Sequence, residues 1–173
     1  MKQPRNYKVK VSQAFLLKLL EYVDKKAKWH KEHSAKATFY GSAVGREDVY
    51  EQSAYSEAAF GKMFGLKMNL DHTKPTPIDF LMPDKFAEKP FRIDVKYCLP
   101  DPDANVYRES LIVSAKHELG EVDAYVLMVG VNRDWRFVGW MLAEETIIDR
   151  QWDTGLPTAA WRVLQPDLRS PDT

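Results

Sequence analysis

The stretch FRIDVKY, residues 91–97, has the strict alternation of a β-strand that buries one face. Its apolar side chains share one face and its charged side chains share the other: Phe91, Ile93, Val95 and Tyr97 against Arg92, Asp94 and Lys96. Three charges in succession are unexpected on the second face of an interior strand, because buried charges are costly unless they are paired or bind a ligand. The stretch therefore predicts a core on one face and a polar site on the other.

A second apolar run, residues 78–82, precedes this strand and contains one acid, Asp79. If the two strands pair through the connection at residues 83–90, Asp79 and Asp94 lie side by side. Two adjacent carboxylates repel strongly at reduced dielectric unless a cation lies between them. A divalent cation that prefers oxygen ligands, such as Mg²⁺, meets this requirement. Lys96 lies on the same face and reaches the same space.

A helix is expected before these strands, at residues 46–65, and it carries a third acid. Placed at 100° intervals, its apolar and small residues fall on one arc: Tyr50, Ala54, Ala58, Phe60, Gly61 and Phe64. Glu57 lies inside this arc, where a carboxylate is costly unless it is paired or bound to metal. The small residues would let the helix approach the sheet closely and bring Glu57 toward the other two acids.

In this order, Glu57, Pro77-Ile78-Asp79 and Asp94-Val95-Lys96 resemble the motif of the PD-(D/E)xK nuclease superfamily. The resemblance covers residues 46–97, with Ile78 standing between the Pro and the Asp of the motif. A later run at residues 137–140, followed by two glutamates, is similar to small bacteriophage members. The family implies an α+β fold of α/β/α layers, with a restriction-endonuclease-like core. In that core a central mixed, largely antiparallel sheet is flanked by helices.

The resemblance also implies an activity, the Mg²⁺-dependent hydrolysis of phosphodiester bonds in DNA by an endonuclease, with Mn²⁺ as a substitute metal. Asp79, Asp94, Glu57 and the main-chain carbonyl of Val95 would bind the metal. Lys96 would orient or deprotonate the attacking water, or offset the charge that develops on phosphorus. The expected catalytic residues are thus Asp79, Asp94, Lys96 and Glu57.

Other interpretations of the same residues remain open. An Asp-x-Lys triplet is a weak signal, since Asp24-Lys25-Lys26 matches it too. If the residues have only a structural role, Asp79 or Asp94 forms an ion pair with Lys96 or Arg92. The functional alternatives are an exonuclease of the same fold and a non-catalytic DNA-binding or structural protein. One active site cuts one strand, so cleavage of both strands would need a homodimer or two passes.

A net charge of zero hides an asymmetry along the chain. Residues 1–40 hold ten Lys and Arg against three Asp and Glu, whereas residues 41–173 hold fifteen against twenty-two. We expect three parts: a basic helix or arm at 1–40, capped by Ser12; a nuclease core at 41–165; and a frayed tail at 166–173. The residues expected to contact DNA phosphates are Lys18, Lys25, Lys26, Lys28 and Lys31, with Arg92, Lys116 and His117 nearer the site.

The remaining pattern predicts strands at residues 111–113, 124–131, 136–142 and 161–164, and short helices at 115–122 and 143–148. Cys98 is the only cysteine, which excludes an internal disulfide. No apolar run approaches the roughly 20 residues that span a bilayer, and the N-terminus lacks the apolar core of a signal peptide. We therefore expect a soluble cytoplasmic protein with no membrane partner, phage-encoded in a bacterial host if the family resemblance extends that far.

Overall fold

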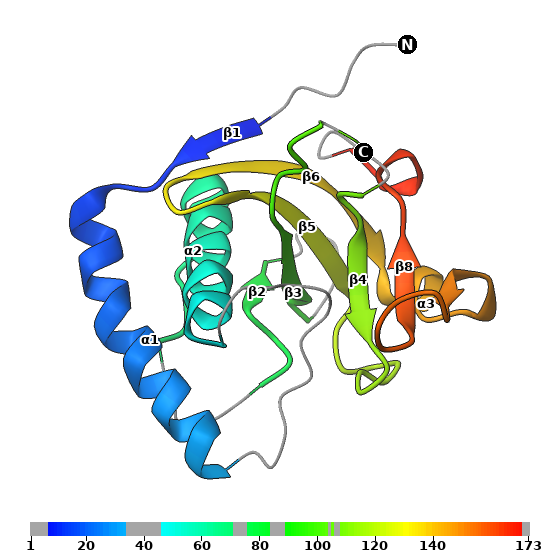
Figure 1. Ribbon diagram of the computed structural model, residues 1–173, viewed down its shortest axis with the longest axis horizontal. Helices are drawn as coiled ribbons and strands as arrows, with labels where there is room; N and C mark the ends of the chain where they lie inside the picture. Colours follow the sequence, from blue (N-terminus) through cyan, green and yellow to red (C-terminus); the bar gives the residue numbers. More distant parts are fainter. Residues whose placement is uncertain are drawn as a thin grey trace.

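The computed structural model describes residues 7–33, 46–70, 76–83, 89–103, 105 and 108–170, and shows a mixed α+β fold (Figure 1). A five-stranded sheet has the order β1-β6-β5-β3-β2, and a three-stranded sheet has the order β4-β8-β7. The elements are β1 (Tyr7–Lys10), α1 (Gln13–His33), α2 (Arg46–Phe64), β2 (Phe80–Met82), β3 (Phe91–Cys98), β4 (Leu111–Ser114), β5 (Ala124–Val131), β6 (Asp134–Leu142), α3 (Ala143–Thr146), β7 (Trp152–Asp153) and β8 (Ala160–Val163).

The central sheet is mixed and largely antiparallel, as the sequence predicted. Only β3 and β5 pair in parallel, and their register joins Asp94 to Tyr125 and Lys96 to Leu127. The other pairs of this sheet are antiparallel. A parallel pair needs a long crossover, and the chain between β3 and β5 supplies it by passing through β4 on the second sheet. This crossover carries His117, which lies beside Asp94 and Lys96.

Helices α1 and α2 cover one face of the central sheet (Figure 1). Ser12 begins α1 as predicted, and its hydroxyl accepts a hydrogen bond from the amide of Phe15 at 3.3 Å. Helix α2 lies between α1 and the sheet, so nearly all of its middle turns are buried. A Cβ at Gly61 would meet the Phe80 ring at 3.1 Å, which confirms that small residues let this helix approach the sheet closely.

The opposite face of the central sheet is covered by the three-stranded sheet and the short helix α3, not by a helical layer. The expectation of α/β/α layers is therefore wrong on this side. Leu111 and Val113 of β4 pack against the β5 residues Tyr125, Leu127 and Val129, while β4 pairs with β8. Because β4 buries its apolar residues in this way, it does not join the central sheet.

The segment at residues 115–122 forms turns, so the short helix expected there is wrong. Gly120 has a φ of 91°, a left-handed conformation that a right-handed helix cannot include. Lys116 and His117 thus lie in a turn after β4 instead of at a helix start. The predicted helix at residues 143–148 is confirmed in shorter form as α3.

The N-terminal segment, expected as a separate basic arm, is integrated into the fold where it is described. β1 pairs with β6, and the core includes Val11, Leu16 and Leu19. Residues 1–6 and 34–45 lie outside the described residues.

The C-terminal segment is folded as far as residue 170, so the expectation of a frayed tail is wrong for residues 166–170. Arg169 and Trp140 exchange two backbone hydrogen bonds, of 3.1 and 2.9 Å. The Arg169 side chain lies over the Trp140 ring and pairs with Glu145 at 2.6 Å. Residues 171–173 lie outside the described residues. None of the described helices is long and apolar enough to cross a membrane.

Candidate active site

The hairpin of β2 and β3 opens at Asp79, and this opening creates the candidate site. The ladder runs from Met82↔Phe91 to Phe80↔Ile93, and the Asp79 amide donates to the Ile93 carbonyl at 2.9 Å. β2 does not extend past Phe80 in this direction. The next β3 amide that points toward β2 is that of Val95, and it therefore lies opposite no residue of β2. The Asp79 carboxylate accepts its hydrogen bond instead, at 2.7 Å. The acid that precedes β2 is therefore held against the backbone next to Asp94.

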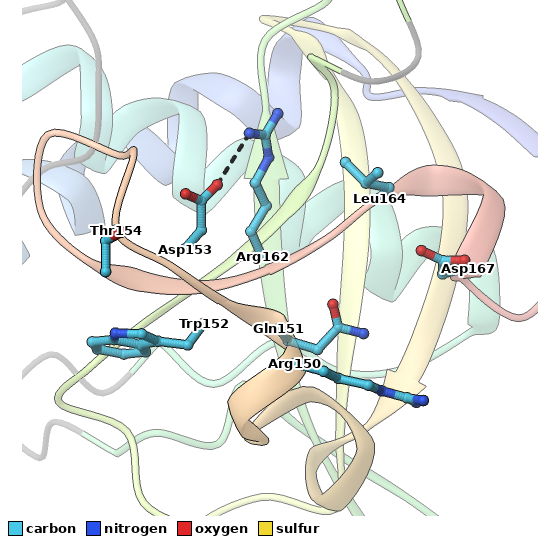
Figure 2. A pocket seen from close by; sticks show the side chains of 8 residues that line it. All are labelled: Arg150, Gln151, Trp152, Asp153, Thr154, Arg162, Leu164 and Asp167. Carbon is cyan, nitrogen blue, oxygen red and sulfur yellow. Dashed lines mark hydrogen bonds and ion pairs between the residues drawn. The ribbon is translucent and has the colours of Figure 1, made fainter.

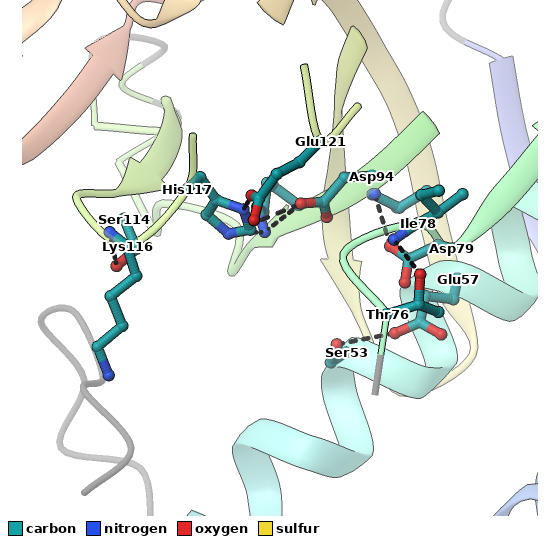
Figure 3. A network of polar contacts seen from close by, with 12 residues as sticks. Ser53, Glu57, Thr76, Ile78, Asp79, Asp94, Ser114, Lys116, His117 and Glu121 are labelled. Atoms are coloured by element: carbon teal, nitrogen blue, oxygen red, sulfur yellow. Dashed lines mark hydrogen bonds and ion pairs between the residues drawn. The ribbon is translucent and has the colours of Figure 1, made fainter. Parts of the chain in front are cut away.

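Asp94 and Lys96 leave β3 on the face opposite α2 and form a chain of polar contacts with the crossover turn. Figure 3 shows Asp94, His117 and Glu121 of this chain. The Lys96 ammonium lies 2.7 Å from Asp94 Oδ2 and 3.1 Å from His117 Nε2. The other ring nitrogen of His117 lies 3.3 Å from Glu121 Oε2. The Asp94 side chain is 5% exposed, whereas Lys96 and His117 are 24% and 19% exposed. Lys96 and His117 therefore lie between the buried Asp94 carboxylate and the solvent.

Burial dominates the electrostatics of His117. It lowers the pKa of the imidazole, and the neighbouring Lys96 charge lowers it further, while Asp94 and Glu121 oppose both effects. The neutral ring is thereby favoured. The turn also fixes the backbone of His117, because the His117 amide donates a hydrogen bond to the Ser114 carbonyl at 3.0 Å.

Glu57 is buried on α2, as its position in the helical arc predicted. Its Oε1 accepts a hydrogen bond from the Ser53 hydroxyl at 3.0 Å, one turn earlier in the helix. Helix α2 packs on the face of Ile93 and Val95, so Glu57 approaches the opening from the side opposite Asp94. In the view of Figure 3, Asp79 lies between Glu57 and Asp94.

The predicted four residues are thus near one opening in the sheet, but they do not form one ligand set. Among the described residues, no three His, Cys, Asp or Glu side chains lie close enough together to hold a metal ion. The structure joins Asp94 to Lys96, Asp79 to the backbone of Val95, and Glu57 to Ser53.

The donor chemistry at Asp79 and Asp94 fits Mg²⁺ nevertheless. Proteins bind this ion through one or two carboxylates, and water and substrate oxygens complete its shell. Asp94 Oδ2 is buried, and in the described part of the chain no group donates an aligned hydrogen bond to it. Its neighbours among the described residues are the Lys96 ammonium, whose contact at 2.7 Å is an ion pair, and His117 Nε2 at 3.8 Å. Buried oxygens are rarely left in this state without a ligand or water.

Arg92, which the sequence placed either on phosphate or on an acid, pairs with an acid. Its guanidinium donates to both oxygens of Asp123, at 3.1 and 2.7 Å, and to the Gly120 carbonyl at 2.6 Å. Its amide also donates to Asp123 Oδ2 at 2.7 Å. These contacts tie β3 to the start of β5, so the residue stabilises the parallel pair.

We expect the Asp123→Asn substitution to lower the free energy of unfolding by about 1 kcal/mol at pH 7. The Arg92 hydrogen bond holds the pKa of Asp123 below its ordinary value of 3.8, so this stabilisation is present above that pH. It is lost as the pH falls through the lower, folded-state pKa. Urea unfolding of both proteins between pH 7 and pH 2.5 should show their stabilities converging below about pH 4. A constant difference across this range would contradict the assignment.

The lysines of α1 do not form a uniformly basic face. Lys25 pairs with Glu21 at 2.6 Å, and Lys18 and Lys28 share the exposed surface of the helix with acidic residues. The side chains of Lys26 and Lys31 lie outside the described residues. Deleting residues 1–36 would remove β1 and the core residues of α1, so it would test folding and not DNA contact.

A separate groove of about 490 Å³ lies on the small sheet, away from these residues (Figure 2). Its charged lining consists of two arginines and two aspartates, and one of each, Arg162 and Asp153, pair at 3.2 Å. This balance gives the groove no net attraction for a polyanion.

Sequence reasoning missed Glu121 and Tyr125 as neighbours of the site. The His117–Glu121 spacing was visible, but it lies in a segment that was expected to be helical. Tyr125 belongs to the apolar strand β5, and its ring lies 5.8 Å from the His117 ring and 5.9 Å from Lys96 Nζ. Only the parallel register of β3 and β5 brings it beside Asp94.

No family model, no curated protein and no solved structure was found to match this chain. The resemblance to the nuclease superfamily therefore rests on the motif residues of the sequence alone.

Proposed function

We propose that this protein is a Mg²⁺-dependent DNA endonuclease whose active site is the opening between β2 and β3. The observation that carries the proposal is the buried Asp94 carboxylate, which lies beside the Asp79-bound Val95 and next to the Lys96 ammonium. Two acids and a lysine, one acid just before β2 and the other two groups on β3, are groups that metal-dependent phosphodiester hydrolysis can use. Their order along the chain is that of the superfamily motif.

Each residue has a distinct task under this proposal. Asp79 and Asp94 would hold the metal, with the Val95 carbonyl as a further ligand, and Glu57, on the other side of Asp79, would hold a water of the metal's shell. The bound metal supplies Lewis acidity and lowers the pKa of a water molecule. Lys96 orients that water or offsets negative charge on the phosphate as the bond breaks. The exposed Lys116, on the turn before His117, would position the DNA backbone without reading its sequence.

The assay is cleavage of supercoiled circular, linear and branched DNA during a Mg²⁺ titration, with EDTA and Ca²⁺ as metal controls. An endonuclease nicks the circle, whereas an exonuclease cannot begin on it. Mn²⁺ is expected to replace Mg²⁺. Absence of metal-dependent cleavage on all three substrates would leave the non-catalytic alternative, in which the Asp94–Lys96 ion pair is a structural contact. Cleavage of both strands at one position would indicate a homodimer or two passes by one molecule.

We expect Lys96→Met to abolish cleavage and to increase the thermal stabilisation that Mg²⁺ provides. Without the ammonium, Asp94 is a buried carboxylate with no counter-charge, and the metal-free protein loses about 2 kcal/mol of stability. The metal then binds without competition from Lys96, so it raises the Tm by more than it does in the wild type.

Differential scanning fluorimetry without metal measures the loss of stability. A series of Mg²⁺ concentrations that increase in 10-fold steps measures the rise in Tm that the metal causes. The matched control is Lys10→Met, which removes an exposed lysine on β1 that pairs with Asp134. It should respond to Mg²⁺ as the wild type does. Equal Mg²⁺ shifts in Lys96→Met and the wild type would contradict a metal at Asp94.

A further inference from the structure

The contact between Lys96 and His117 fixes which nitrogen of the imidazole carries the proton. A lysine ammonium has three donors and no acceptor, so the nitrogen 3.1 Å from it must offer a lone pair. Nε2 is therefore unprotonated. The proton of the neutral ring then sits on Nδ1, which lies 3.3 Å from the Glu121 carboxylate. The tautomer follows from these two partners.

Glu121 is itself held in place by the turn that contains both residues. Its Oε2 accepts a hydrogen bond from the Glu118 amide at 3.1 Å and faces Nδ1 of His117 as well. The imidazole edge is closed on one side by the Tyr125 ring, which meets it in a T-shaped contact. The ring of His117 is thus fixed by a carboxylate, a backbone turn and an aromatic wall.

The two contacts of the Lys96 ammonium, with His117 and with Asp94, differ in kind. The ammonium forms an aligned hydrogen bond with His117, whereas its contact with Asp94 is an ion pair without that alignment. A long, flexible lysine side chain loses much rotational freedom when it is held in one place. His117 supplies the acceptor that fixes it, on the side of the ammonium away from β3.

We propose that Glu121 and His117 form a positioning relay that holds the Lys96 ammonium against Asp94 through the Nδ1–H tautomer of His117. The relay rests on the proposed function only for its effect on cleavage, since the arrangement itself is independent of activity. It gives His117 a role different from contact with phosphate. Glu121 and His117 are positioning residues, because they act through Lys96.

The test is nitrogen NMR of protein labelled with ¹⁵N-histidine, which distinguishes a protonated from an unprotonated ring nitrogen. The chain has four histidines, and His117→Gln identifies the signals of His117 by their loss. We expect Nδ1 to be protonated and Nε2 unprotonated in the wild type. In Lys96→Met, Nε2 loses the ammonium and lies 3.8 Å from Asp94 Oδ2, while Nδ1 still faces Glu121. The share of rings that carry a proton on Nε2 should therefore rise above that of the wild type. Lys10→Met serves as the control and should keep the wild-type tautomer.

Cleavage kinetics supply the second measurement. His117→Leu removes the acceptor, and we expect it to lower kcat by about 10- to 100-fold while the KM for DNA stays within about twofold. His117→Gln should recover part of the loss, because its amide oxygen can accept from Lys96. A phosphate contact would instead raise KM in both variants, and that result would overturn the relay.

The two hypotheses fail in different ways. A wild-type His117 with its proton on Nε2, or a share of Nε2-protonated rings that does not rise in Lys96→Met, overturns the relay whether or not DNA is cut. The expected tautomers in a protein that never cuts DNA would support the relay as a structural arrangement and refute the proposed function.

Discussion

Replacing Asp94 with asparagine should lower the rate of Mg²⁺-dependent DNA cleavage by about a thousandfold or more, which corresponds to about 4 kcal/mol of transition-state stabilisation. Asparagine has nearly the same shape but no negative charge, so it binds a divalent cation poorly and no longer attracts the Lys96 ammonium. Initial rates of nicking on supercoiled DNA, at saturating Mg²⁺, measure the effect.

The matched control is Asp153→Asn, which makes the same chemical change at an acid paired with Arg162 on the small sheet. Asp153 shares no contact with the candidate site, so this variant should cut at the wild-type rate. DNA binding of Asp94→Asn, measured by fluorescence anisotropy in Ca²⁺, should persist. Wild-type cleavage by Asp94→Asn would refute the site, and equal losses in both variants would indicate damage to the fold.

Glu109→Leu should cause the largest loss of stability, about 3–5 kcal/mol, because it leaves a partly buried arginine without its counter-charge. Glu109 is buried, and its carboxylate contacts the guanidinium of Arg136 on β6. It also accepts hydrogen bonds from the Gln165 side chain at 2.8 Å and from the Asp101 amide at 3.0 Å. One acid thus joins the segment after β3, strand β6 and the C-terminal segment. Urea unfolding measures the loss.

A double-mutant cycle separates the ion pair from the other contacts of Glu109. Arg136→Met alone should also destabilise the protein, and the double variant should lose less than the sum of the two single losses. Lys10→Met, which disrupts an exposed pair, should change the free energy of unfolding by less than about 1 kcal/mol. Additive losses for Glu109 and Arg136 would show that the pair itself contributes little.

Much of the helical layer and of the central sheet could be predicted from local patterns. The arc of small and apolar residues on α2 and the alternation along β3 are both periodic signals, and both elements formed where expected. Strand β1 was missed because four residues with two exposed lysines give too short a pattern, and the basic composition suggested an arm. The second sheet was missed because the pairing of β4 with β8 joins distant segments, and no local pattern reports it.

The candidate site could be predicted only in part. The proximity of Asp79 to Asp94 followed from the expected hairpin, and the burial of Glu57 followed from its helical position. The hydrogen bond from Val95 to Asp79 depends on the residue at which β2 ends, which the sequence does not specify. The contact of Lys96 with His117 depends on the path of the crossover, and that path depends on the parallel pairing of β3 with β5.

The position of β1 has a consequence for association between molecules. β1 covers the edge of β6, so loss of this short strand would leave a row of unpaired backbone groups on a nine-residue strand. Such an edge is a template for aggregation or for strand exchange between copies. Lys8 and Lys10 face solvent on β1 itself, and charged side chains at an open edge disfavour the addition of a further strand. These four residues thereby disfavour pairing with another molecule at this edge of the sheet.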